Sequence, residues 1–284
     1  MDSIREVIQP ITQNLPAPVQ ELGVTLLGEK CYKTLLLDID VTSTECIKLG
    51  ISKGLGLGII AASSIVKVPQ ILKLISSGSA AGVSFLSYLL ETGALLVGLA
   101  YNKRQENPFS TYGENALILA QNVVIAVLVL NYTGKPSAAA LFVAGLAASA
   151  YALFSNDILD MPTLYTINGA AATVGVASKL PQILANWQQG STGVLSAVTV
   201  FSYLAGSLSR IFTTLQEVDD NQILYGFIAG FGLNVILAMQ MLYYWNVSTK
   251  KSLLSKKQPL PVAPSAGTTT ATPKGKSPTT RRRG

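Results

Sequence analysis

Apolar residues in this chain gather in long stretches that are separated by short polar segments. Each stretch is close to the roughly 20 residues that an α-helix needs to cross a bilayer. The fourth stretch, SAAALFVAGLAASAYALF, is rich in small residues, which let helix backbones approach closely, and we interpret it as a packed linker helix. The pattern predicts seven membrane spans near residues 54–75, 84–101, 112–131, 137–154, 162–187, 196–216 and 222–246.

Composition supports a membrane environment over a soluble one. A length of 284 residues would allow one or two soluble domains, but only 13% of the residues are charged and the mean hydropathy is +0.41. Ordinary globular proteins carry about 25% charged residues, so this chain has too little polar surface to cover a soluble body. The lipid bilayer is therefore the expected partner, and we expect no nucleic-acid partner.

The two flanking segments differ in charge and predict an orientation. Residues 1–53 are of mixed character, whereas residues 247–284 are dominated by Ser, Thr, Pro, Gly and basic side chains and are predicted to be disordered. Lysine and arginine near the ends of spans are retained in the cytoplasm. Because the basic tail follows the last of seven spans, we predict a luminal N-terminus and a cytoplasmic C-terminus.

Cys31 and Cys46 both fall on the predicted luminal side. An oxidising lumen could join them in a disulfide. Two buried, unrelated thiols are the interpretation that we favour from the sequence, and the alternative stays open.

An internal repeat organises the chain. KVPQILKLISSGSAAGVS at 67–84 returns as KLPQILANWQQGSTGVLS at 179–196. The copies fall in the first and fifth spans, which predicts two parallel three-helix units, 54–131 and 162–246, joined by the linker helix 137–154. A proline within a helix removes a backbone donor and bends the chain, so Pro69 and Pro181 are predicted to form a pair of hinges.

Charged side chains inside the spans are the candidate ligand-binding groups, because a charge in the hydrocarbon is costly unless it is paired or functional. Lys67 lies at nearly the same depth as Glu91, and the two can neutralise each other. The corresponding pair in the second unit is Lys179 and Tyr203, so Lys179 has no acid at its depth. Snorkelling to the headgroups is an equal alternative for Lys179.

Three further residues complete the predicted binding set. Arg210 adds a positive charge to the second unit and is suited to bidentate recognition of phosphate. Gln70 and Gln182 follow the two prolines and can bind freed backbone groups or a polar ligand. We therefore expect the second unit to be electropositive inside and to receive an anionic group.

Other chemistry is excluded or weak. The chain has no histidine and no paired carboxylates within one span, so we expect no enzyme activity, no metal and no cofactor. The glycines of KGLGLGI are interpreted as a close helix contact, because their spacing does not fit a nucleotide-binding loop.

The Lys-x-Pro-Gln repeats and the three-one-three plan resemble PQ-loop proteins, which include sugar and amino-acid carriers. More specifically, the region from Glu29 to Asn246 resembles the mannose-phosphate-dolichol utilisation defect protein family. The resemblance is carried by SKGLGLGI at 52–59, NPFS at 107–110, LSAVTVF at 195–201, GSLSRIFTTLQE at 206–217 and YWN at 244–246.

The resemblance implies an endoplasmic-reticulum membrane protein that is needed for mannose-phosphate-dolichol and glucose-phosphate-dolichol to serve as luminal donors. These donors feed N-glycan precursors, glycolipid anchors and protein mannosylation, and glycosyltransferases of that membrane are the implied partners. Two other classes stay open, a carrier for a small solute and a non-transporting scaffold for glycosyltransferases. The sequence does not indicate an oligomeric state.

Overall fold

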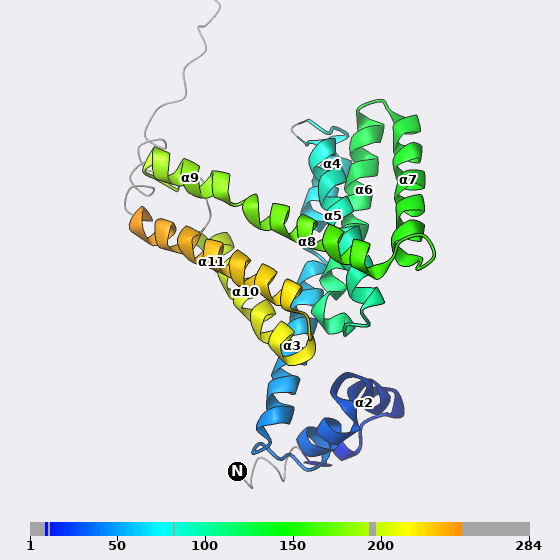
Figure 1. Ribbon diagram of the computed structural model, residues 1–284, viewed down its shortest axis with the longest axis vertical. Helices are drawn as coiled ribbons and strands as arrows, with labels where there is room; N and C mark the ends of the chain where they lie inside the picture. Colours follow the sequence, from blue (N-terminus) through cyan, green and yellow to red (C-terminus); the bar gives the residue numbers. More distant parts are fainter. Residues whose placement is uncertain (1–8, 11, 82, 193–196, 246–284) are drawn as a thin grey trace, which may run out of the picture.

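The computed structural model describes residues 9–10, 12–81, 83–192 and 197–245, and the predicted basic tail lies outside them. All regular structure in these residues is helical (Figure 1). A π-helical turn, η1 (Lys33–Leu37), follows the first long helix, and a 3-10 turn, η2 (Phe109–Thr111), lies between α5 and α6. The α-helices are α2 (Ala17–Tyr32), α3 (Thr44–Ser63), α4 (Val68–Ser77), α5 (Phe85–Arg104), α6 (Gly113–Tyr132), α7 (Pro136–Phe154), α8 (Met161–Ala177), α9 (Leu180–Gln189), α10 (Ala197–Glu217) and α11 (Asn221–Tyr243).

The predicted all-α membrane fold is confirmed. The predicted spans near 84–101, 112–131, 137–154, 196–216 and 222–246 correspond to α5, α6, α7, α10 and α11. The first and fifth spans are each divided, into α3 with α4 and α8 with α9. The helical segment of the first predicted span is longer than the span, because α3 starts at Thr44 and the span is expected to begin near residue 54. Among the described residues, the segments long and apolar enough to cross a membrane are Thr44–Ser77, Gly113–Tyr132, Pro136–Phe154 and Asn221–Tyr243.

Each repeated proline begins a new helix instead of bending a continuous one. Pro69 and Pro181 lie in the first turns of α4 and α9, where a missing backbone N–H costs nothing. The Ile65 carbonyl, four residues before Pro69, accepts a hydrogen bond of 3.2 Å from the backbone N–H of Val68. The two short helices also end alike, in the left-handed Gly78 and Gly190. The repeat therefore encodes a break and a short helix twice.

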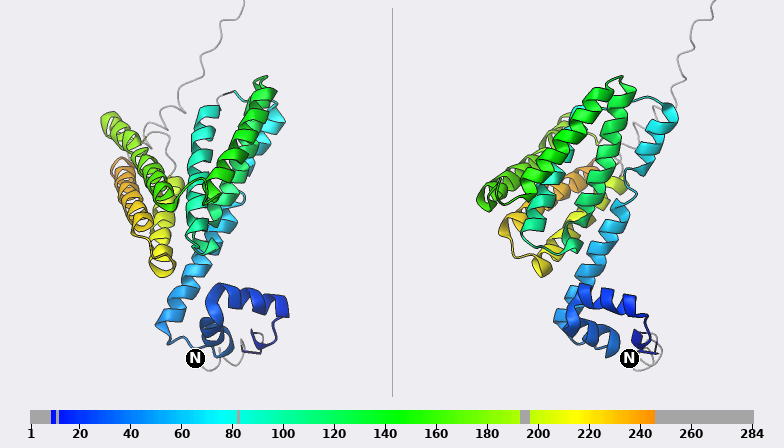
Figure 2. Two further views of the ribbon diagram at one scale, coloured as in Figure 1. Left: turned by 45° about the vertical axis from the view of Figure 1, so that its right-hand side comes forward. Right: turned by 90° about the vertical axis from the view of Figure 1, so that its right-hand side faces the viewer.

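Two groups of helices make up the described spans. The first half consists of α3 to α6, and the second consists of α8 to α11, with α7 packed against α5 and α6 through Ala139 and Phe142. The halves meet where α3 contacts α10 and where α5 contacts α8. They lie close together near the N-terminal segment and diverge toward the end where α4 and α9 lie (Figure 2). We call these the closed end and the open end.

The N-terminal segment is attached to the closed end by a disulfide. The structure joins Cys31, at the end of α2, to Cys46, in the first turn of α3, and both side chains are buried. This differs from the two unrelated thiols that we favoured from the sequence. The η1 turn lies between α2 and α3, where the chain folds back, and Cys31 and Cys46 therefore lie side by side. The spacing of the two cysteines in the sequence does not reveal this proximity.

The disulfide gives the first prediction. Digestion of the protein from an oxidising compartment under non-reducing conditions should release one cross-linked peptide pair containing Cys31 and Cys46. The reduced sample serves as the control and should yield two separate peptides. Alkylatable thiols at both positions in the native protein would contradict the assignment, and with it the placement of this end of the chain in the lumen.

Candidate functional site

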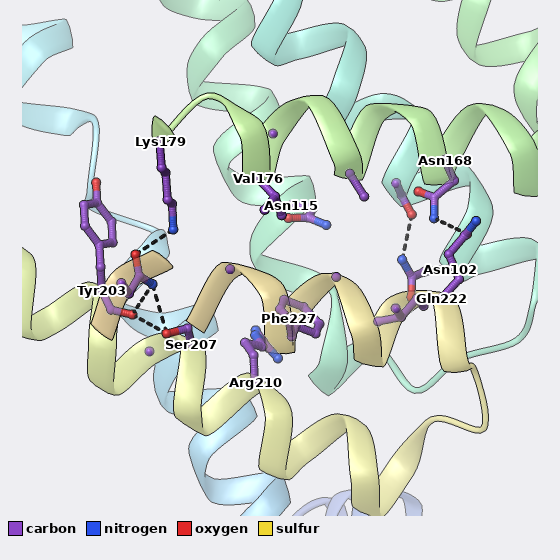
Figure 3. A pocket seen from close by; sticks show the side chains of 18 of the residues that line it. Asn102, Asn115, Asn168, Val176, Lys179, Tyr203, Ser207, Arg210, Gln222 and Phe227 are labelled. Carbon is purple, nitrogen blue, oxygen red and sulfur yellow. Dashed lines mark hydrogen bonds between the residues drawn. The ribbon is translucent and has the colours of Figure 1, made fainter. Parts of the chain in front are cut away.

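A cavity of about 480 Å³ lies among α8, α10 and α11 and is also lined by residues of α5 and α6. Figure 3 shows polar side chains directed toward it from both halves of the protein. Amides donate and accept hydrogen bonds at the same time, so the cavity suits a ligand that carries several hydroxyl groups. The amide side chains of the lining are Asn102, Asn115, Asn168, Gln222 and Asn234.

Lys179 lines this cavity at the break between α8 and α9. Its ammonium donates a hydrogen bond of 2.7 Å to the side-chain oxygen of Asn234. The Asn234 amide in turn donates to the Tyr203 carbonyl at 3.1 Å and to the Ser207 hydroxyl at 3.0 Å, which fixes its orientation (Figure 3). Among the ion pairs of the described residues, none involves Lys179. Its charge is therefore hydrogen-bonded but not neutralised.

The repeat reproduces the lysine contact in the first half. Lys67 donates to the side-chain oxygen of Asn122 at 2.6 Å, and the asparagine follows its lysine by 55 residues in both halves. Lys67 also forms an ion pair with Glu91, with Nζ–O distances of 2.7 and 2.8 Å. Each lysine thus has an equivalent asparagine as its first partner. Only Lys67 also has a carboxylate partner, because Tyr203 occupies the position equivalent to Glu91.

Of the six predicted binding residues, the cavity brings together only Lys179 and Arg210. Lys67, Gln70 and Glu91 form a separate group in the first half, where Gln70 accepts a hydrogen bond of 2.7 Å from the Tyr88 hydroxyl. Gln182 is exposed on α9 and does not line the cavity. The two glutamines therefore have different surroundings despite their equivalent places in the repeat.

Arg210 is buried and already neutralised, contrary to the expected electropositive interior. Its guanidinium forms an ion pair with Glu114 of α6 and donates to the Ser110 carbonyl at 3.2 Å. Nearby, Glu217 of α10 pairs with Lys53 of α3 at 2.6 Å and accepts a hydrogen bond of 2.8 Å from the Ser110 hydroxyl. These five residues form an inter-half cluster that joins the halves at the closed end.

Gly56 allows the inter-half cluster to assemble. A Cβ at this position of α3 would collide with the backbone of Ser110, so a larger residue would push η2 away. Gly54 and Gly58 face open space instead. The KGLGLGI motif therefore provides a close backbone contact at its central glycine, and this contact places the Ser110 carbonyl within reach of Arg210.

The described residues contain no group of three His, Cys, Asp or Glu side chains that could hold a metal ion. The charged residues of the site are instead arranged as pairs, with Lys179 apart from them.

Two copies of one helix–break–helix pattern, arranged around a polar cavity, define a multi-pass membrane protein of the repeat type used by carriers. Comparison with known families agrees, since the family model described as "PQ loop repeat" matches residues 51–111 and 164–223. The chain belongs to the PQ-loop repeat family. It is 30% identical over 209 residues to human solute carrier family 66 member 3, a match that covers 72% of this chain and 98% of that protein. No solved structure matches the chain.

Proposed function

We propose that this PQ-loop protein acts in the endoplasmic-reticulum membrane on dolichol-phosphate-linked mannose and glucose. In this proposal it binds the sugar phosphate in the cavity and moves or presents it for use by luminal glycosyltransferases. The observation that carries the proposal is the cation Lys179, which lines the cavity and has no carboxylate partner among the described residues. Lys53, Lys67 and Arg210 each have such a partner.

The charges of ligand and site correspond. A sugar attached to a polyprenyl phosphate is a phosphodiester with one negative charge, and Lys179 offers one positive charge. An unpaired cation inside a membrane protein is costly, and an anion that enters the cavity relieves this cost. The surrounding amides are suited to sugar hydroxyl groups, because they offer donors and acceptors together.

The shape of the molecule fits access from one side of the membrane. The two halves diverge at the open end, whereas the inter-half cluster holds them together at the closed end. With the N-terminus luminal and the C-terminus cytoplasmic, this conformation would receive the ligand from the cytoplasmic leaflet. Opening of the closed end would then be required to expose the sugar to the lumen.

The direct test is reconstitution of the full chain into liposomes that contain a fluorescent polyprenyl-phosphate mannose. We expect the protein to speed exchange of this lipid between leaflets, or to bind it in detergent if the protein only presents it. Protein-free liposomes and a fluorescent phosphatidylcholine are the controls. Exchange of both lipids at equal rates, or neither exchange nor binding of the sugar lipid, would contradict the proposal.

A small-solute carrier is the second candidate, supported by the relative named as a solute carrier and by the amide-lined cavity. The same liposomes can be supplied with radiolabelled hexose or cationic amino acid outside. Uptake of a solute without exchange or binding of the sugar lipid would select this candidate. A protein that does neither, but co-purifies with glycosyltransferases, would be a scaffold.

A single substitution can convert the second half to the charge state of the first. Tyr203→Glu places a carboxylate where the first half has Glu91, beside the lysine of the same repeat. We expect the new ion pair to lower affinity for the anionic sugar lipid by at least about tenfold. Tyr203 lines the polar cavity, so the new carboxylate would stand among polar side chains.

Tyr203→Gln is the matched control, since glutamine has nearly the same shape as glutamate but carries no charge. Binding should be measured by fluorescence anisotropy in detergent for both variants. Equal affinities of the Glu and Gln variants would show that the charge at Lys179 is not what the ligand recognises.

A further inference from the structure

A second cavity, of about 870 Å³, lies between α8 and α11. Its lining is mostly apolar and includes small residues on both helices. Tyr165 and Tyr225, which line it, are 45% and 65% exposed, so this space opens at the surface of the helix bundle. In a membrane, that surface faces lipid hydrocarbon. We call this second cavity the α8–α11 groove.

The groove and the polar cavity are neighbours. Four residues line both spaces, namely Ala172, Val176, Gln222 and Gly226. Alanine and glycine provide little or no side chain, and a Cβ added at Gly226 would find no atom within 4 Å. The wall between the two spaces is therefore thin at the point where α8 and α11 face each other.

At the break between α8 and α9, a charged residue and an apolar residue lie on the two sides of this wall. Lys179 lines the polar cavity, whereas the next residue, Leu180, lines the groove. A cation and an apolar side chain thus adjoin each other along the backbone. This arrangement matches the junction of an amphipathic lipid, where a charged headgroup meets its hydrocarbon chain.

We propose that the α8–α11 groove holds the polyprenyl chain of the ligand while its phosphate lies at Lys179 in the polar cavity. The inference rests on the proposed function, which supplies a ligand whose chain is far too long for a cavity of about 480 Å³. It places the path by which the chain enters from the bilayer within the second half, and not between the two halves. Burial of each methylene group in a dry groove contributes to affinity, so the chain adds binding that the headgroup lacks.

The test compares two ligands, a full-length polyprenyl-phosphate mannose and a water-soluble mannose phosphodiester with a short alkyl group. Ala229→Phe fills part of the groove from a position that lines the groove and does not line the polar cavity. We expect it to weaken binding of the long-chain ligand by about tenfold or more. Binding of the short ligand should change by less than about threefold.

Gly232→Phe is the matched control on the same helix. An added Cβ there meets no atom within 4 Å, and Gly232 lines neither space. This variant should bind both ligands as the unmodified protein does. If Ala229→Phe binds both ligands normally, the chain does not use the groove, although the proposed function stands as long as the unmodified protein binds the lipid. If the unmodified protein binds neither ligand, both proposals fail.

Photochemical labelling of the unmodified protein tests the same route without a substitution. A polyprenyl-phosphate mannose with a diazirine in its chain should label residues of the groove such as Ala229 and Leu233. An excess of the unlabelled ligand should suppress this labelling. Labels confined to the interface of α3 with α10, or to α7, would overturn the inference, and so would labelling of the groove that the ligand does not compete away, because it would show ordinary bilayer contact.

Discussion

Replacement of Lys179 by alanine is expected to weaken binding of the polyprenyl-phosphate sugar by about 10- to 100-fold, because a hydrogen bond to a charged group contributes about 1.5–3 kcal/mol. The loss should be accompanied by normal insertion and normal abundance, since the Lys179 ammonium has one hydrogen-bond partner and no ion pair to lose among the residues that the structure describes. Affinity measured by fluorescence anisotropy in detergent gives the first readout. Luminal mannosylation in cells that depend on this protein gives the second.

Lys67→Ala is the matched control, because it removes the repeat-equivalent lysine from a group outside the polar cavity. Its charge is already neutralised by Glu91, so the ligand should bind this variant as it binds the unmodified protein. Lys179→Arg, which preserves the charge, should retain part of the affinity. Equal losses in the two alanine variants would show that neither lysine has a specific role in binding.

The outline of the fold was predictable from the sequence because two strong patterns coincide. Length and apolar character located the spans, and the duplicated Lys-x-Pro-Gln segment located the breaks. What the sequence did not reveal is that Pro69 and Pro181 start new helices. A proline is compatible with a bend inside a helix and with a first turn, and only the backbone hydrogen bonds decide between them.

The lysine environments were only partly predictable. The depth argument places Glu91 beside Lys67 and leaves Lys179 without an acid. The described residues include the Lys67–Glu91 ion pair and no ion pair of Lys179. The paired asparagines were missed as part of this group. Asn122 and Asn234 occupy equivalent places in the two copies, so extension of the repeat alignment into the third helix of each half would have found them.

Contacts between the halves could not be derived from the sequence. Lys53 and Glu217 lie just outside the predicted spans 54–75 and 196–216, yet they form an ion pair across 164 residues. The sequence likewise predicts that Arg210 binds an anionic ligand, because its actual partner, Glu114, belongs to the other half and local patterns do not reveal it. Such pairs depend on how two bundles dock, which local patterns do not encode.

The inter-half cluster gives the prediction with the largest effect on stability. Glu217→Leu should lower the free energy of unfolding by about 3–5 kcal/mol, because it leaves the buried Lys53 ammonium without its counter-charge. The two side chains are 12% and 2% exposed, so water cannot replace the lost partner. Thermal unfolding of the purified protein in detergent, followed by size-exclusion chromatography, measures the loss.

Two controls separate the ion pair from other consequences of the substitution. The double variant Lys53→Met with Glu217→Leu should recover most of the stability, because replacement of both members of a buried pair by apolar residues is often close to neutral. Glu45→Leu breaks the pair with Lys30, whose side chains are 75% and 78% exposed, and should cost less than about 1 kcal/mol. A double variant as unstable as Glu217→Leu alone would mean that the hydrogen bonds from Ser52 and Ser110, and not the charge of Lys53, make Glu217 necessary. The closed end would then be held by the η2 contact and the Arg210–Glu114 pair, and Gly56→Ala, which displaces Ser110, should destabilise the protein as much as Glu217→Leu does.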